Sequence, residues 1–382
     1  MLFLRLCWMS YAGAVRRLLL LLFLCAPLVF AQGREADRLL NSALEAQQRG
    51  DLPTAIRDYE KVLQLNPKLA EARVNLGAAL ADSGRFDDAI AQYRRALPDM
   101  PDKSAVQLNI GLAYYKKGDL ASASREFEEL HKLKPDNAQI AILLGDSDTR
   151  RGRGSDAVAM LTPLEAADAS NPDFQYVLGT ALIQAGRRRD GAQKLDALAQ
   201  QTQNADAYLL AGSTFLDLND YEHARSDLEA ALRLKPGLPH IYTLVGMARD
   251  DVGDQTAAEE ALREALRQDP NDFNANLYLG SILYKRRAMD EAKPYLDRAL
   301  ALNPSSSMAR YEVAIWNSKS GNYADAATEL EQVTRSDPKW LEPHVELANV
   351  YYRLHRPQDG AKERAIVTRL TAEQQSKGPG VP

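Results

Sequence analysis

Glycine recurs along this chain at an almost constant interval, and that interval constrains the fold more than any other feature of the sequence. Successive members of the series are 34 residues apart, except for one step of 33 residues between Gly179 and Gly212. The series runs through Gly77, Gly111, Gly145, Gly179, Gly212, Gly246 and Gly280. A fixed period of this length indicates a stack of structural repeats, each of which buries its apolar face only against its neighbours.

A series of prolines keeps the same phase. Each proline lies ten residues before the glycine position of the following repeat: Pro67, Pro101, Pro135, Pro236, Pro270, Pro304 and Pro338. Apolar residues in each half repeat have helical spacing, and proline is expected to close the second helix because it forces the preceding residue out of the α region. Further glycines mark the turn between the helices, where a left-handed backbone costs glycine nothing: Gly84, Gly118, Gly152, Gly186, Gly253 and Gly321.

The remaining columns of the repeat resemble the tetratricopeptide repeat. In one repeat, Gly77 is followed by Leu80, Gly84, Ala89, Tyr93, Ala96 and Pro101, and in the next, Gly111 is followed by Tyr114, Gly118, Ala123, Phe127, Leu130 and Pro135. The resemblance implies an all-α fold, a right-handed α-solenoid of about ten helix–turn–helix repeats over residues 36–376. The repeats are expected to start near Ala36, Ala70, Ser104, Ala138, Pro172, Ala205, Pro239, Phe273, Ser307 and Leu341.

Two places depart from the pattern. At the junction of the fourth and fifth repeats, Pro172 begins a repeat, the fifth repeat has Gly191 in place of alanine, and it has no closing proline. We expect a tighter connection between these repeats and a weaker fifth repeat. In the tenth repeat, Arg364 occupies the aromatic column, which predicts a polar helix that caps the stack. Residues 377–382 are expected to be a disordered tail.

Residues 1–31 have the composition of an export signal. Arg16 and Arg17 precede an apolar run from Leu18 to Phe30, and the small residue Ala31 provides a cleavage position. The run is shorter than the roughly 20 apolar residues of a membrane-spanning helix, so we predict a cleaved signal peptide and a protein that is exported to the bacterial periplasm or secreted. The alternative is an uncleaved N-terminal anchor that faces the protein toward the periplasm and provides its membrane contact.

Composition excludes several function classes. The formal net charge is −5, and loss of the three leader arginines makes it −8, which argues against a nucleic-acid partner. Both cysteines, Cys7 and Cys25, lie in the predicted leader, so the remaining chain has no thiol chemistry. The five histidines lack the spacing of metal ligands. We therefore predict no enzyme activity, catalytic residue, metal site or cofactor.

The resemblance implies that the first helix of each repeat lines a concave groove, with positions 2, 5, 9 and 12 pointing into it. Position 5 is apolar or aromatic in nine of ten repeats: Leu40, Val74, Leu108, Ile142, Tyr176, Leu209, Thr243, Leu277, Tyr311 and Val345. This stripe suits an amphipathic helix or an extended apolar peptide; the alternative is that position 5 packs against the next first helix. Tyrosines at position 12 are typical anchor residues, and aspartates in repeats five to seven favour basic segments.

These patterns predict a non-catalytic protein–protein interaction scaffold in the cell envelope that binds a peptide or helix in its groove. The candidate partner-binding residues are Tyr115, Tyr176, Asp206, Asp217, Asp250, Tyr284, Tyr311 and Tyr352. The alternative function is a docking or regulatory subunit of an envelope polysaccharide-synthesis or secretion complex. Arginine clusters at the turns are either ordinary solvated charges or a basic rim for an anionic partner: Arg150, Arg151 and Arg153; Arg187, Arg188 and Arg189; Arg286 and Arg287.

Overall fold

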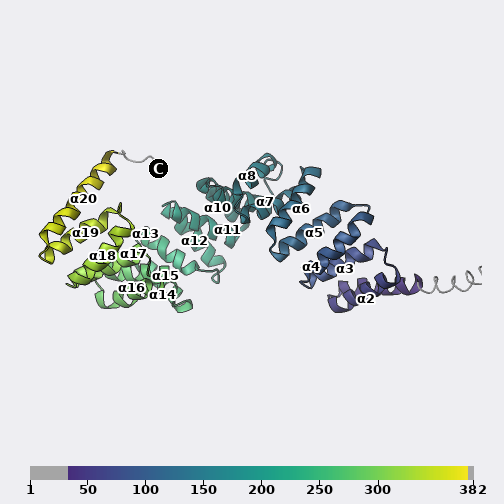
Figure 1. The fold of residues 1–382 in the computed structure, drawn as a ribbon, viewed down its shortest axis with the longest axis horizontal. Helices are drawn as coiled ribbons and strands as arrows, with labels where there is room; N and C mark the ends of the chain where they lie inside the picture. Colours follow the sequence, from purple (N-terminus) through teal and green to yellow (C-terminus); the bar gives the residue numbers. More distant parts are fainter. Residues whose placement is uncertain (1–32, 377–382) are drawn as a thin grey trace, which may run out of the picture. The chain divides into compact units, whose positions relative to one another are not determined.

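The computed structural model describes residues 33–376, and every regular element in that range is a helix (Figure 1). The predicted leader and the predicted tail lie outside the described residues. Within them, no helix has the length and apolar character needed to cross a bilayer. The chain divides between Arg187 and Arg188 into two compact units, which we call the N-terminal unit (described residues 33–187) and the C-terminal unit (described residues 188–376).

The N-terminal unit begins with a helix over residues 33–48. It continues with α2 (Leu52–Leu65), α3 (Ala70–Asp82), α4 (Phe86–Ala96), α5 (Lys103–Lys117), α6 (Leu120–Leu133), α7 (Ala138–Arg150), α8 (Gly154–Leu161) and α9 (Pro172–Gln184). Short 3₁₀ segments, η1 (Leu97–Asp99) and η2 (Thr162–Leu164), follow α4 and α8. Each helix packs against the next along the chain, as α3 does against α4 and α4 against α5.

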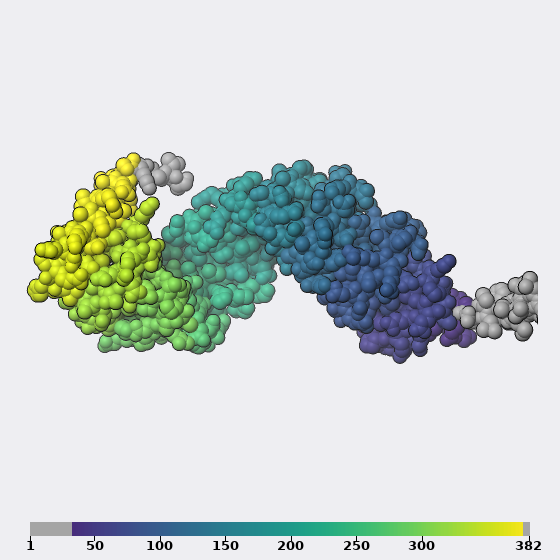
Figure 2. Space-filling model, in the orientation of Figure 1, coloured from purple at the N-terminus to yellow at the C-terminus, as the bar shows by residue number. Residues whose placement is uncertain are grey.

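The C-terminal unit repeats the same pairing. Its helices are α10 (Arg188–Thr202), α11 (Ala205–Asp217), α12 (Tyr221–Leu234), α13 (Ile241–Asp251), α14 (Gln255–Gln268), α15 (Phe273–Lys285), α16 (Met289–Leu302), α17 (Ser307–Lys319), α18 (Tyr323–Ser336), α19 (Leu341–Arg353) and α20 (Pro357–Ser376). In the space-filling view, the segments of each unit follow one another in sequence order without interruption (Figure 2). The predicted class of a stacked all-α solenoid is confirmed.

Most first helices begin where the sequence starts a repeat. α3, α7, α9, α11, α15, α17 and α19 begin at the expected residues, α5 begins one residue before Ser104, and α13 begins two residues after Pro239. Second helices end just ahead of the proline series: α2 ends at Leu65, and Asn66, before Pro67, has the extended conformation φ −134°, ψ 85°. Steric exclusion from the α region before proline therefore sets these boundaries.

The glycine series has a packing cause. A Cβ atom built at Gly111 would lie 2.5 Å from the fully buried ring of Phe127, and one at Gly246 would lie 2.6 Å from Leu262. In both cases the glycine allows the first helix to approach a large side chain of the second helix of the same repeat. Packing between the two helices, rather than backbone freedom, therefore requires the 34-residue glycine period.

The turn between the helices keeps one backbone conformation even where glycine is missing. Gly118 has φ +86° and donates its N–H to the carbonyl oxygens of Tyr114 and Tyr115, which closes the helix with a left-handed cap. The corresponding residues Asn219, Arg287 and His355 adopt φ values of 57°, 66° and 59°. The repeat thus keeps the left-handed turn without glycine: asparagine and histidine tolerate this conformation, whereas Arg287 adopts it although its side chain disfavours it.

The connection between the fourth and fifth repeats is longer than expected. α8 ends after 8 residues at Leu161, and the chain passes through η2 and a series of turns before α9 begins at Pro172. Between α6 and α7, by contrast, only residues 134–137 intervene. The prediction of a tighter connection is therefore wrong, because Pro163 lies in the 3₁₀ segment that replaces the last turns of the second helix.

First helices of successive repeats contact one another directly inside each unit. α3 contacts α5 and α7 contacts α9 in the N-terminal unit, while α11, α13, α15, α17 and α19 form such a series in the C-terminal unit. Among the described residues, no pair of successive second helices is in comparable contact. The first helices of the C-terminal unit therefore form a continuous surface, and we call the side of a unit on which its first helices lie the first-helix face. At the end of the chain, α20 buries only Gly360 and Leu370, in agreement with a polar cap.

Candidate functional site

Position 5 of the repeat takes part in the packing between helices. Leu40, Val74 and Leu108 are half-buried against apolar clusters that extend over neighbouring repeats. Leu277 is buried, and Thr243 is buried with its hydroxyl donating to Asp272 Oδ2 at 2.7 Å. Packing therefore buries Thr243 and Leu277, whereas Val345 is 41% exposed and the other position-5 residues keep part of their surface accessible.

The predicted tyrosines lie half-buried on first helices of both units. In the N-terminal unit, Tyr176 is on α9, and Tyr115 on α5 donates its hydroxyl to Asp146 and accepts a hydrogen bond of 3.0 Å from Arg150. Burial and the contact with Asp146 raise the pKa of Tyr115. The neighbouring repeat thus fixes Tyr115, which makes it a poor anchor for a mobile partner.

Three tyrosines of the C-terminal unit follow one another on α15, α17 and α19. Tyr311 packs on Trp340 with ring centroids 4.9 Å apart, and burial raises its pKa to about 12. The guanidinium of Arg364 lies 4.8 Å from the ring centroid of Tyr352. Tyr284 is half-buried, and burial followed by the charges of nearby glutamates raises its pKa.

The predicted aspartates fall into two kinds. Asp206 and Asp217 lie exposed at opposite ends of α11, in surface ion pairs with Lys235 (3.4 Å) and Arg188 (3.1 Å). Such exposed pairs are weak and solvated. Asp250, at the end of α13, has a side chain that is only 8% exposed. The structure therefore separates Asp250 from the other two.

Asp250 lines a cavity of about 410 Å³ on the first-helix face of α13, α15 and α17, which we call the acidic pocket. Its apolar lining consists of Met247, Phe273, Leu277, Tyr278 and Met308. Its polar lining consists of Asp250, Asp251, Asn274, Ser281, Lys285, Ser306 and Glu312. Apolar walls with a few polar groups and a volume in the range of roughly 300–1,000 Å³ are typical of ligand pockets.

Three carboxylates and one ammonium group set the charge of the acidic pocket. Asp250 Oδ2 accepts a hydrogen bond of 3.2 Å from Lys285 Nζ, and Asp250 Oδ1 is buried and accepts none from any described residue. Burial raises the pKa of Asp251 and of half-buried Glu312, and the charge of Asp250 adds to both shifts. With all groups ionised the pocket carries two uncompensated negative charges, so it favours a cation.

Two residues of this pocket were expected at the groove from the sequence, Asp250 as a binding candidate and Leu277 in the position-5 stripe, and most of the others were missed. Met247 and Met308 occupy positions 9 and 2 of their repeats, which the family resemblance already directs toward the groove. Glu312 and Lys285 lie one residue beyond positions 5 and 12. The two methionines could have been predicted from the sequence if residues of every type at the groove positions, and not only tyrosines and aspartates, had been considered.

A second cavity of about 440 Å³ lies at α17, α19 and α20 and contains Tyr352. Its lining is more polar than that of the acidic pocket and contains more cationic residues. It consists of Ser318, Lys319, Tyr323, Glu346, Asn349, Val350, Tyr352, Arg353 and Arg364. A cavity of about 670 Å³ lies at α14 and α16, where Arg263 is bonded to Glu259 and Glu291 and is therefore already compensated. The acidic pocket combines an unsaturated buried charge with apolar walls, and for that reason it is the candidate site.

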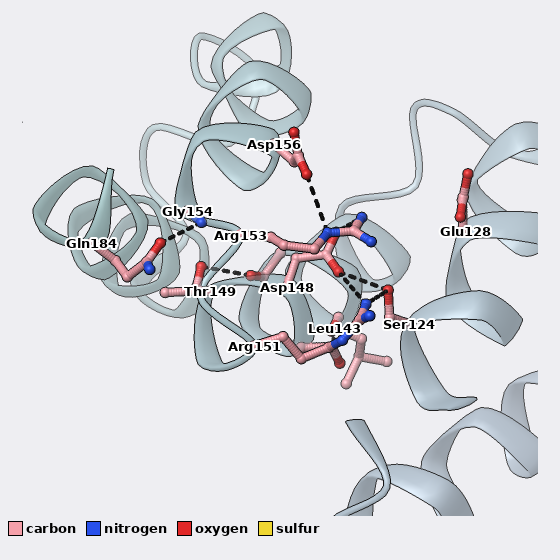
Figure 3. Close-up of polar contacts among 12 residues, drawn as sticks. Ser124, Glu128, Leu143, Asp148, Thr149, Arg151, Arg153, Gly154, Asp156 and Gln184 are labelled. Carbon is pink, nitrogen blue, oxygen red and sulfur yellow. Dashed lines mark hydrogen bonds and ion pairs between the residues drawn. The ribbon is translucent and has the colours of Figure 1, made fainter. Parts of the chain in front are cut away.

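Most of the turn arginines pair with acids of the protein. In the N-terminal unit, Arg151 and Arg153 converge on buried Asp148 at 3.3 and 3.0 Å, and Ser124 donates to the same carboxylate at 2.7 Å (Figure 3). In the C-terminal unit, lysines and arginines at the turns pair with the preceding or following repeat: Arg188 with Asp217, Arg189 with Asp220 and Arg286 with Glu259. This pairing favours the interpretation of ordinary turn charges over a basic rim.

Among residues 33–376, no three His, Cys, Asp or Glu side chains converge as a metal-ligand set. The three carboxylates of the acidic pocket therefore do not converge on one point.

The stacked helix pairs and the first-helix face define a repeat protein of the interaction type. Two family models, both described as tetratricopeptide repeat, match residues 40–104, 114–180, 176–239 and 246–314, more than half of the chain. The chain belongs to the tetratricopeptide repeat family.

Individual relatives are distant. Anaphase-promoting complex subunit 3 of Schizosaccharomyces pombe is 21% identical over 160 residues, which are 42% of this chain and 24% of that protein. TPR repeat-containing thioredoxin TTL4 of Arabidopsis thaliana is 28% identical over 87 residues, 23% of this chain and 13% of that protein. The matched part thus spans about a quarter or less of these relatives. The solved structure of a tetratricopeptide repeat protein from Parabacteroides merdae covers 65% of this chain and 99% of its own, with 14% identity and a TM-score of 0.51, and shows the fold.

Proposed function

We propose that the chain is a non-catalytic scaffold that binds a segment of another protein, a peptide or a helix, on the first-helix face of its C-terminal unit. The observation that carries this proposal is the acidic pocket. Three successive first helices contribute its walls, so its position depends on stacking, as expected when an array presents one surface to a partner. Membership in the tetratricopeptide repeat family supports the class, and one relative is named as a subunit of a complex.

The proposal is tested by photo-crosslinking in intact cells from a probe at Met308, which is 48% exposed at the acidic pocket. The matched control is Thr328, an exposed residue of the second helix α18. We expect a discrete protein to be captured from Met308 and not from Thr328. Equal capture from both positions, or none from Met308, would contradict binding at this surface.

We further propose that the protein acts in the cell envelope. This rests on the sequence of residues 1–31, with Arg16, Arg17 and the apolar run to Phe30. Determining the N-terminal residue of the protein from envelope fractions provides the test. A mature chain that starts at Gln32 supports export with cleavage. An intact leader in the membrane fraction supports the anchor, and a cytosolic protein with an intact leader contradicts both.

The narrower role of docking or regulatory subunit in a polysaccharide-synthesis or secretion complex stays a prediction. The same crosslinking experiment decides it, because the captured protein either belongs to such a complex or does not.

A further inference from the structure

Asp250 occupies an unusual position among the carboxylates of the acidic pocket. Its side chain is more than nine-tenths buried and lines the cavity, yet only one of its two oxygens has a partner. A buried carboxylate oxygen without a hydrogen bond is costly, and native proteins seldom leave such an atom unsatisfied. Asp250 therefore has an unused acceptor next to the cavity.

The surrounding charges specify the kind of donor. Lys285 neutralises one carboxylate, while Glu312 on α17 and Asp251 at the exposed edge of the pocket have no cation that compensates them fully. The carboxylates do not form a metal-ligand set in the described part of the chain. An elongated organic cation with several N–H donors can reach carboxylates that do not converge on one point, whereas a compact ion cannot.

The apolar groups specify what carries the cation. Met247, Leu277 and Met308 lie in the lining together with the aromatic residues Phe273 and Tyr278. Such walls accommodate the aliphatic stem of lysine or arginine and an adjacent apolar side chain. Methionine is flexible and adapts to helical partners of varied shape.

We propose that the acidic pocket holds a lysine or arginine side chain from a basic, amphipathic segment of the partner protein, with Asp250, Asp251 and Glu312 as its anionic contacts. This inference rests on the proposed function and adds the chemistry of the partner. The charged head of the bound residue donates to the carboxylate of Asp250, which has an unused acceptor, and the apolar neighbours of that residue contact Met247 and Met308. Lys285 acts as an internal competitor, since it shares Asp250 with the incoming cation.

The inference is tested with defined peptides and the full-length protein labelled at its methionine methyl groups. The probe is an amphipathic alanine–leucine helix of about 16 residues, a length at which isolated helices begin to be stable, with one central arginine. The matched peptide carries citrulline, which is nearly isosteric and uncharged. Among the seven methionines of the sequence, Met247 and Met308 report on the pocket, and Met100 and Met160 of the N-terminal unit are internal controls.

We expect the arginine peptide to shift the Met247 and Met308 signals and to bind at least tenfold more tightly than the citrulline peptide. Asp251→Asn together with Glu312→Gln should remove this difference, and Asp325→Asn, which neutralises an exposed aspartate of the second helix α18 outside the pocket, should not. Lys285→Gln should strengthen arginine binding several-fold, an effect opposite in sign to that of a damaged fold. Thermal melts check that each variant is folded.

Equal binding of the two peptides, or no shift at Met247 and Met308 with either, overturns the inference. Its failure is distinguishable from failure of the proposed function. If crosslinking at Met308 captures a partner whose contact segment has no lysine or arginine, the scaffold function stands and the cation-binding role is wrong. If Met308 captures nothing, the proposed function fails as well.

Discussion

Two buried aspartates near the ends of first helices, one in each unit, differ in how completely they are satisfied. Asp148 on α7 accepts hydrogen bonds from Ser124 and Arg151 at one oxygen and from Arg153 at the other. Asp250 on α13 accepts one from Lys285 and leaves Oδ1 without a described partner. A carboxylate saturated by its own protein ties helices together, whereas an unsaturated one beside a cavity is available to a ligand.

The difference originates in the turn that follows each helix. After Asp148 the chain reads Arg150, Arg151, Gly152, Arg153, which supplies two guanidinium groups to the carboxylate. After Asp250 the turn contains Val252 and Gly253 and no cation. The only cation at Asp250 among the described residues comes from the next repeat, where Lys285 ends α15. Local sequence therefore decides which aspartate stabilises the fold and which faces the pocket.

The largest expected effect is on stability. Asp148→Ala should reduce the free energy of unfolding by about 3 kcal/mol, because it removes three charge-assisted hydrogen bonds to a buried group. Asp250→Ala should cost less than about 1 kcal/mol, since loss of one ion pair is offset by removal of an unsatisfied oxygen. Urea unfolding followed by circular dichroism compares the two midpoints. Similar losses would show that the two carboxylates have equivalent surroundings.

A third buried aspartate extends the comparison, because its neighbour is an acid. Asp227 on α12 is 4% exposed, and burial together with Asp196 raises its pKa to about 8. It is therefore protonated in the folded protein at neutral pH and ionised in the unfolded chain. Its contribution to stability is complete below its ordinary pKa of 3.8 and is lost as the pH rises toward and through 8.

Asp227→Asn should therefore stabilise the protein at pH 7, by roughly 2 kcal/mol, and flatten the fall of stability between pH 4 and 8. Unfolding midpoints measured over this pH range provide the test. A variant that is less stable than the wild type at pH 7, or an unchanged pH profile, would show that the carboxylate is ionised in the fold.

The same glycine-to-alanine substitution in each unit tests whether the two units also differ in how tightly their helices pack. Gly111→Ala and Gly246→Ala should each cost about 1–3 kcal/mol by overpacking a close helix contact. Gly237→Ala, where no described atom lies within 4 Å of the added Cβ, is the control and should change stability by less than about 0.5 kcal/mol. If the two glycine substitutions cost very different free energies of unfolding, the two units differ in overall stability. The contrast between Asp148 and Asp250 would then follow from that difference and not from local charge.

The smallest expected effect on stability comes from giving the C-terminal turn a cation. Val252→Arg places an arginine where Arg151 stands relative to the turn glycine, but two residues after Asp250 and not three. It therefore adds a positive charge near Asp250 without the close contact that Arg151 makes with Asp148, and should stabilise the fold by no more than about 0.5 kcal/mol. The same change should weaken binding of the arginine peptide at least fivefold. Unchanged binding would show that Asp250 does not contact the ligand.

Sequence periodicity predicted the fold almost completely, because each repeat depends on local columns such as those of Gly111 and Phe127, which hold a small and a large residue in most repeats. It failed at α8, where Pro163 replaces a regular helix end with a 3₁₀ segment. The site was predicted only in part. Position 12 identified Asp250, but the role of Lys285 depends on a contact 35 residues away, which no local pattern contains. The ion pair between Arg188 and Asp217 could not be predicted for the same reason, because it also joins different repeats.

The measurement that tests the account most directly is the arginine-peptide titration of two conservative variants, followed at the methyl group of Met308. Asn at either position keeps the shape of the side chain and removes its charge. The account predicts that Asp250→Asn weakens binding at least tenfold while Asp148→Asn leaves it unchanged. Equal effects of the two substitutions, or unaltered binding to Asp250→Asn, would contradict the assignment of Asp250 as the carboxylate that receives the partner.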